Sequence, residues 1–133
     1  MKVGLFINTQ FREGYNLVER VPEMVAQVRA AREAGFASLW FPHHWLTHPM
    51  QMLQITPLMG YISAHAQGMT IGPNILILPP LNPVHVAEEA ATLDVLTGGN
   101  YSSALAWATA SRSSTLSTSA SASGRLGLMR ASP

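Results

Sequence analysis

Four short apolar segments begin at nearly regular intervals along the chain, near residues 2, 38, 70 and 100. The interval of about 30 to 36 residues matches one strand-plus-helix unit of a βα barrel or of a doubly wound sheet. The first segment, Lys2 to Ile7, contains the Val, Leu, Phe and Ile that are typical of a strand buried on both faces. The interval therefore predicts an α/β fold built from repeated βα units.

Helices are predicted between these strands. From Asn16 to Ala34 apolar side chains recur at helical spacing, and Gly35 follows where a left-handed residue can end the helix. Further strands are expected at Ser38 to Phe41 and at Thr70 to Leu78, with a weaker helix over Ile55 to Ala66 between them. The predicted order is strand, helix, strand, helix, strand.

The next segment has the clearest helix signal of the chain. Asn82 can cap the helix, Pro83 suits its first position, and Gly98 suits its end. The side chains expected to face inward are Val86, Ala90, Leu93 and Leu96.

The length limits how much of a barrel the chain can form. A complete (β/α)₈ barrel needs roughly 250 residues, and the chain has 133. The expected fold is a partial TIM barrel that contains the first three to four βα units. The composition changes abruptly after Tyr101, so residues 1–101 are assigned to the barrel and the Ser- and Ala-rich residues 102–133 to a disordered tail.

Composition excludes several classes of partner and site. Eight basic residues against seven acidic ones leave no broad charge for binding nucleic acid or an acidic membrane. The absence of cysteine excludes disulfides and thiolate metal ligands. The longest apolar run, Ile75 to Pro80, is too short to span a bilayer. A soluble, cytoplasmic protein with a small neutral partner is expected.

Three motifs between Glu33 and Asn100 carry a family resemblance: EAGFASLWFPHHW, IGPNILILPPLNPVHVAEEAATLD and VLTGGN. Together they resemble the bacterial luciferase-like family of flavin-dependent oxidoreductases. Pro42 stands where the family usually has Glu, and Asn100 stands where it has Arg after the two glycines. The resemblance ends within two residues of Asn100.

The resemblance implies a monooxygenase or a related reductase that oxidises a small organic substrate with reduced flavin and O₂. The implied cofactor is FMN, with a deazaflavin as the alternative, and it would be reduced by NAD(P)H directly or through a partner reductase. Family members are often homodimers or heterodimers.

The candidate active site lies at the carboxyl ends of the strands, where βα barrels place their catalytic residues. There Phe6 to Asn8, Phe41 to His44 and Leu78 to Pro80 should face one pocket. A histidine can exchange protons near neutral pH, so His43 and His44 are candidate catalytic residues, and the resemblance favours His44. The alternative is that one or both histidines only bond to the backbone of the loop.

The resemblance also implies cofactor contacts. Asn74 and Ile75 match the place where the family often has a non-prolyl cis peptide beside the isoalloxazine ring, although an ordinary strand bend is the alternative. The candidate flavin-binding residues are Phe6, Asn74, Ile75 and Leu78. The family holds the flavin phosphate with the Arg that Asn100 replaces, and a neutral amide cannot form the same charge-assisted bidentate contacts. Weak or no FMN binding is therefore expected.

A reading-frame slip explains why the resemblance stops so sharply. When Tyr101 to Ser117 are back-translated with chosen wobble bases and one G is restored after the Tyr101 codon, the segment can read YVLGAGLGYRVEEFDAF, the glycine-rich form of the family's fourth strand. The Trp107 codon has no freedom and forces one of these glycines. We hypothesise that residues 102–133 are out of frame and that the chain is truncated and inactive; a genuine Ser/Ala-rich linker is the alternative.

Two other classes of function compete with this interpretation. A metal hydrolase could use the five histidines, which are His43, His44, His48, His65 and His85, but no His-x-His or His-Glu-x-x-His spacing supports it, and no metal site is predicted. A non-enzymatic α/β fragment could instead act through self-association or partner binding, because a partial barrel exposes strand edges and an apolar face.

Overall fold

Strands and helices alternate along the chain as predicted. The computed structural model describes residues 1–106. Its main elements are β1 (Gly4–Phe6), α1 (Leu17–Glu33), β3 (Ser38–Phe41), α2 (Ile55–Ser63), β5 (Thr70–Pro73) and α3 (Pro83–Leu96). The α/β class and the order of the βα units are confirmed.

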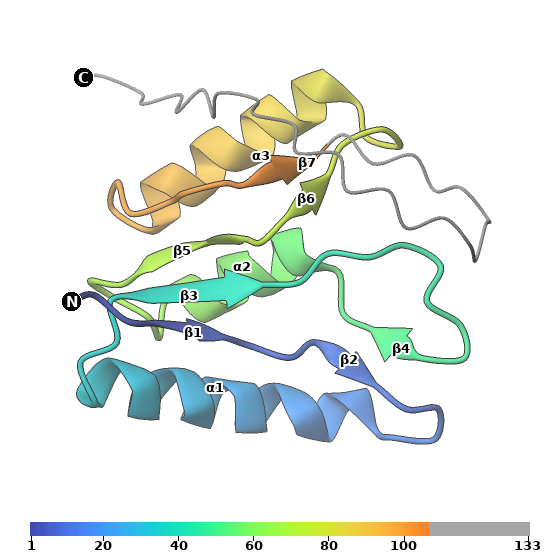
Figure 1. The fold of residues 1–133 in the computed structure, drawn as a ribbon, viewed down its shortest axis with the longest axis horizontal. Coiled ribbons are helices and arrows are strands. Elements are labelled where there is room, and N and C mark those ends of the chain that lie inside the picture. Colours follow the sequence, from blue (N-terminus) through green and yellow to red (C-terminus); the bar gives the residue numbers. More distant parts are fainter. Residues whose placement is uncertain (107–133) are drawn as a thin grey trace.

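The sheet is parallel throughout, with the strand order β1-β3-β5 (Figure 1). Its register aligns Phe6 with Trp40 and Trp40 with Gly72. A fourth strand follows at the edge: Tyr101 bridges to Ile71, and β7 (Leu105–Ala106) pairs in parallel with β6 (Leu76–Ile77). Four neighbouring parallel strands are the arrangement expected for the first part of a βα barrel.

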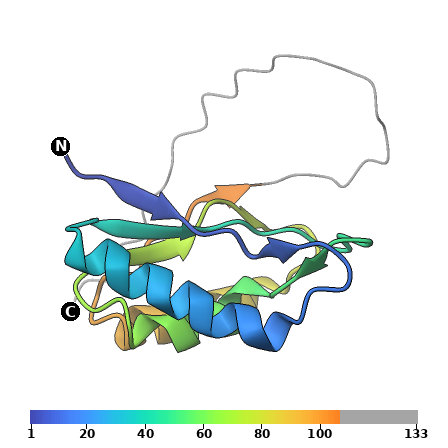
Figure 2. The same ribbon diagram turned by 90° about the horizontal axis from the view of Figure 1, so that it is seen from below.

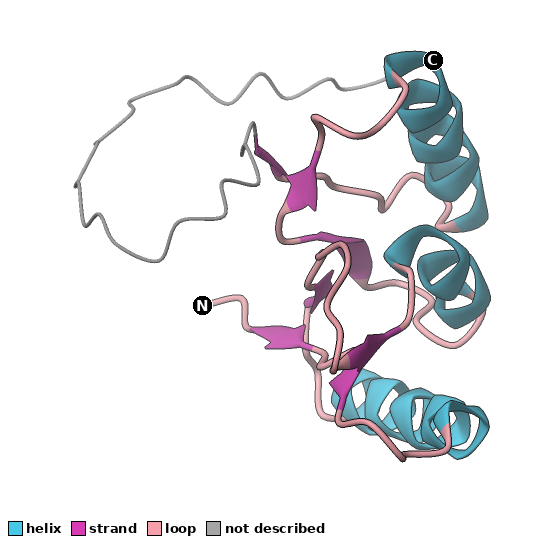
Figure 3. Cartoon of the chain, turned by 90° about the vertical axis from the view of Figure 1, so that its right-hand side faces the viewer, coloured by secondary structure: helices cyan, strands magenta, loops and turns pink. Residues whose placement is uncertain are grey.

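All three helices lie on one side of the sheet (Figures 2 and 3). Because side chains alternate along a strand, Leu39 and Phe41 of β3 face the helices and are fully buried, whereas Ser38 and Trp40 face the other side. The helices contribute the rest of the buried core, mainly Met24, Val25, Val28 and Ala31 of α1, Ile55, Leu58, Met59 and Ile62 of α2, and Leu93 of α3. The sheet face without helices corresponds to the inside of a barrel.

The predicted ends of α1 and α3 are confirmed, whereas α2 ends at Ser63, three residues before the predicted Ala66. The side chain of Asn82 accepts a hydrogen bond from the N–H of Val84 at 2.9 Å, and Pro83 opens the helix. Asn16 caps α1 in the same way through Val18. Gly35 follows α1 with a φ of 81°, a left-handed conformation that favours glycine.

Leu96 is an exception to the predicted inward face of α3. Leu93 is buried and Val86 packs against the core, but Leu96 is 55% exposed. It is the last residue of the helix, and its Cδ1 would lie 4.0 Å from a Cβ atom placed on Gly60 of α2. The prediction for Leu96 was therefore wrong.

The third and fourth strands differ from their predicted bounds. The predicted strand from Thr70 to Leu78 is divided into β5 and β6 by a bend at residues 74–75. Residues 102–106, which were assigned to a disordered tail, instead pair with β5 and β6 as part of the fourth strand. Parallel pairing uses backbone groups only, so small side chains such as Ser and Ala do not prevent it. The remainder of the predicted tail, residues 107–133, lies outside the described residues.

Sequence reasoning missed a small antiparallel ribbon above the carboxyl ends of the strands. β2 (Gln10–Phe11) pairs there with β4 (Gln51–Met52). The side chain of Gln51 donates hydrogen bonds to the carbonyls of Arg12 and Tyr15, each at 3.0 Å. The ribbon thereby joins the loop that follows β1 to the loop that follows β3.

Candidate functional site

The carboxyl edge of the sheet brings together most of the predicted site residues. Phe6 ends β1, His43 and His44 follow β3, and Asn74 and Ile75 follow β5. Phe6 is 54% exposed, and His44, Asn74 and Ile75 are also exposed. Leu78 is half-buried and packs against the core.

An indole ring that was not predicted as a site residue lies on the same inner face. A Cβ atom placed on Gly4 would lie 2.9 Å from Nε1 of Trp40, and one on Gly72 would lie 3.3 Å from its Cζ3. The ring therefore spans all three strands, and the two glycines leave room for it. Its Nε1 donates to Ser38 Oγ at 3.0 Å. The alternation of Ser38 and Trp40 with Leu39 and Phe41 was the signal that could have placed Trp40 on this face.

The two adjacent histidines have different environments. His43 is only 4% exposed, and its Nδ1 accepts a hydrogen bond from the backbone N–H of Ile77 at 3.0 Å. Because a backbone N–H can only donate, this Nδ1 carries no proton, and the neutral ring carries its proton on Nε2. Burial, and secondarily the charge of His44, lower the pKa of His43 below its usual value of 6.5. His44 is exposed at the rim.

The segment after β5 has the geometry that the resemblance implied. The peptide bond between Asn74 and Ile75 is cis, although Ile75 is not a proline. The N–H of Asn74 donates to the carbonyl of Phe41 at 2.8 Å, which holds the bend against the end of β3. Ile75 is 42% exposed beside it. The bend therefore presents one amide and one apolar side chain at the edge that also carries His44.

Asn100 lies at the opposite edge from this site. Its carbonyl accepts from the N–H of Ile71, near the start of β5, whereas Ala104 donates to Pro73 near the end. Four residues of strand separate the two positions by about 13 Å. The side-chain amide of Asn100 donates instead to the carbonyls of Thr97 and Gly98. The resemblance places the phosphate contact at position 100, whereas Asn100 lies where the fourth strand begins, at the edge opposite the other candidate residues.

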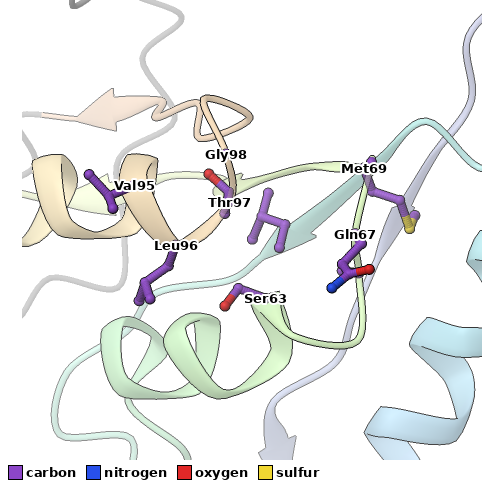
Figure 4. Close-up of a pocket in the computed structure, with 10 residues that line it drawn as sticks. Ser63, Gln67, Met69, Val95, Leu96, Thr97 and Gly98 are labelled. Carbon is purple, nitrogen blue, oxygen red and sulfur yellow. The ribbon is translucent and has the colours of Figure 1, made fainter.

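Two cavities are found away from the carboxyl edge. One, of about 290 Å³, lies at the opposite edge between the ends of α2 and α3, where Ser63, Gln67, Leu96 and Thr97 line it (Figure 4). The other, of about 490 Å³, lies between α1 and α2, where Arg29 is 3.3 Å from His65 Nδ1. Neither is at the strand ends where barrel enzymes place their chemistry.

Within residues 1–106, no three His, Cys, Asp or Glu side chains lie close enough together to hold a metal ion. In the same part of the chain, no helix is long and apolar enough to cross a membrane.

Comparison with known families gives one match. The profile described as luciferase-like monooxygenase matches residues 1–100. No curated protein sequence matches the chain at a significant level.

Solved structures share the fold. The oxygenating constituent of 3,6-diketocamphane monooxygenase from Pseudomonas putida, a type II Baeyer-Villiger monooxygenase in complex with FMN, has a TM-score of 0.72 and 16% identity over 82% of this chain and 30% of its own. An F420-dependent secondary alcohol dehydrogenase with an F420–acetone adduct has a TM-score of 0.62 and 24% identity over 78% of this chain and 31% of its own.

A third similar structure is the coenzyme F420-dependent tetrahydromethanopterin reductase of Methanopyrus kandleri, with a TM-score of 0.61 and 16% identity over 78% of this chain and 26% of its own. The chain therefore spans about 30% of the length of the FMN-bound monooxygenase and similar shares of the other two. Identities this low show the fold alone.

Proposed function

Because the chain belongs to the luciferase-like monooxygenase family, whose profile matches residues 1–100, we propose that it forms the first part of a flavin-dependent oxidoreductase site. The proposed reaction is the oxidation of a small organic substrate with reduced flavin and O₂, next to His44. NAD(P)H, acting directly or through a partner reductase, would reduce the flavin.

The observation that carries this proposal is the convergence at the carboxyl edge. Phe6, His44 and the Asn74–Ile75 bend come from three different βα units and are exposed at one edge of one sheet. Active sites of βα barrels are assembled in this way, from the ends of several strands. The two cavities elsewhere contain no comparable set of exposed polar and aromatic groups from three strand ends.

The described residues suit the ring of a flavin or deazaflavin better than its phosphate. Phe6 and Ile75 offer exposed apolar surface, and Asn74 offers an amide beside them. The side chain at position 100 lies at the other edge and is bonded within its own turn. We therefore propose that this part of the chain contributes to ring binding, with FMN or a deazaflavin as the cofactor.

The chain's own side chains have separable tasks in this proposal. The exposed imidazole of His44 can donate a proton to the substrate or accept one from it. Phe6 and Trp40 provide an apolar floor that excludes water from the reacting groups. When bound, the reduced flavin would supply the electrons that reduce O₂, so that one oxygen atom enters the substrate and the other leaves as water.

The proposed binding of the flavin ring can be tested with riboflavin and FMN. Their binding to the chain is measured by the quenching of tryptophan fluorescence. Both should bind with similar, weak affinity, because the described residues meet the ring and not the phosphate. Phe6→Ala should weaken both by about ten-fold, since it removes a large apolar contact. Tyr61→Ala is the matched control, because Tyr61 is equally exposed but lines the cavity between α1 and α2. No saturable quenching, or equal effects of the two variants, would contradict the proposal.

Self-association is the second candidate function. Among the described strands, β1 has one unpaired edge, and Val3 and Phe6 are exposed beside it. Unpaired parallel strands and exposed apolar side chains favour pairing with another chain. A size that increases with concentration on gel filtration, and that Phe6→Ala reduces, would favour this candidate over the enzymatic one.

A further inference from the structure

We propose that His43 is a positioning residue, whose neutral imidazole fastens the segment of residues 74–78 to the end of β3. The residue next to it, His44, is then the one left free for proton chemistry. Only the statement about His44 rests on the proposed function; the fastening role of His43 does not.

The geometry shows what the imidazole holds together. Up to Phe41, backbone hydrogen bonds join β3 to β5, and in the described residues the N–H of Asn74 to the carbonyl of Phe41 is the last of them. Beyond the bend, β6 pairs with β7 on its other side. The 3.0 Å bond between His43 Nδ1 and the N–H of Ile77 therefore spans the place where the two strands separate.

The environment of the ring suits an acceptor that stays neutral. His43 is almost fully buried, and the ring of Trp45 meets it edge to face with centroids 4.9 Å apart. His44 is the one titratable neighbour whose charge acts on it, and that charge disfavours a second proton on His43. A neutral imidazole with a free Nδ1 can accept from a backbone N–H, whereas an imidazolium cannot.

The same contacts argue against a direct catalytic role. To take a proton from a substrate at Nδ1, His43 would have to release Ile77 and leave a partly buried N–H without this partner. His44 forms no such hydrogen bond among the described residues, and its side chain is exposed to solvent. Two adjacent residues of the same type thus have different tasks, one in the support of the site and one at its surface.

Hydrogen exchange of the Ile77 amide, measured by NMR on the whole chain without cofactor, tests the proposal. His43→Leu keeps the volume but removes the acceptor, so Ile77 should exchange about ten-fold faster or more. His43→Asn places an oxygen near the position of Nδ1 and should restore most of the protection. His44→Leu is the matched control and should leave the Ile77 amide unchanged.

A second measurement covers the case in which His43→Leu does not fold. The ¹⁵N shifts of the imidazole nitrogens in the unmodified chain should show an unprotonated Nδ1 on His43 at neutral pH. A protonated Nδ1, or equal protection of Ile77 in the unmodified chain and in His43→Leu, would overturn the proposal. None of these readouts involves a flavin, so a failure of flavin binding would leave their outcome unaffected.

Discussion

At the scale of single residues, neighbours in the chain can differ sharply in what they are able to do. His43 and His44 look interchangeable in the printed sequence, but one is buried and bonded to Ile77 and the other is exposed. A β-strand sends successive side chains to opposite faces, as in β3, but Pro42 and His43 are both buried after the strand, so the difference between the two histidines follows from the loop and not from this alternation.

The stability of the chain should depend on pH through His43. Its pKa is lowered in the folded state, so the unfolded chain binds the proton more tightly. The stabilising contribution is therefore complete above the unfolded value of about 6.5 and is lost as the pH falls below it towards the folded pKa. Urea unfolding between about pH 8 and pH 5 should show this loss.

His43→Asn is the control for this pH dependence. Asparagine does not titrate, so the part of the pH profile that belongs to His43 should disappear. Identical slopes for the two proteins below pH 6.5 would show that His43 does not gain a proton on unfolding.

Gly72 provides a second test at this scale. A Cβ atom there would collide with the carbonyl oxygen of Ser102 and would press on Trp40. Gly72→Ala should therefore destabilise the fold by about 1 to 3 kcal/mol through overpacking. Gly60→Ala is the matched control: its Cβ would meet only Leu96 Cδ1 at 4.0 Å within α2. That variant should stabilise the fold by about 0.5 to 1 kcal/mol.

At the scale of elements, capping predicts where helices begin. Asn82→Ala removes the side-chain acceptor for the N–H of Val84 and should cost about 1 kcal/mol in the free energy of urea unfolding. Asn82→Asp keeps an acceptor and should stay close to the unmodified chain. Equal losses in the two variants would mean that the side chain acts through something other than this cap.

The regular elements could be predicted because each depends on a local pattern. β3 and the start of α2 were predicted at the residues where they occur, and α1 and α3 within a residue or two. Periodicity did not predict the bend at residues 74–75, although Gly72, Pro73 and Asn74, which are uncommon inside strands, stand there. It was expected only from the family motif.

The ribbon and the inner face required information that no local pattern contains. β2 and β4 are two residues each and lie about 40 residues apart, so neither has a period that could be detected. The placement of Trp40 depends on glycines in two other strands, which are brought into register only by folding. The edge at which Asn100 lies could not be derived from the sequence for a related reason: the motif places the residue near the fourth strand but does not show at which end of it.

At the scale of the whole molecule, the described residues form a row of parallel strands, the antiparallel ribbon β2–β4 and three helices, and the chain spans 26% to 31% of the three structures compared with it. The residues that we propose to contact the flavin ring all lie in the described part of the chain. Along the fourth strand, the positions level with the site begin near Ala104, because this residue pairs with Pro73 and Leu76. A phosphate contact from this strand would therefore have to come from beyond that point.

The proposed frame slip leads to a prediction at the same scale. Sequencing the coding DNA across the Tyr101 codon should reveal a missing base whose restoration gives the glycine-rich continuation. The restored chain should copurify with yellow flavin absorbance, whereas the chain of 133 residues should not. A confirmed reading frame, or a restored chain without colour, would favour the Ser/Ala-rich linker or a cofactor other than FMN.

The ribbon between β2 and β4 restricts how a chain of this kind can change in length. Gln10 and Phe11 are in register with Met52 and Gln51, and Gln51 also holds the carbonyls of Arg12 and Tyr15. An insertion in the loop before Gln10, or in the loop after His48, would shift the register of β2 against β4. The other of these two loops would have to change in length to restore the register. Length variation among relatives should therefore be paired between these two loops, and a loop graft that exchanges only one of them should fail to fold.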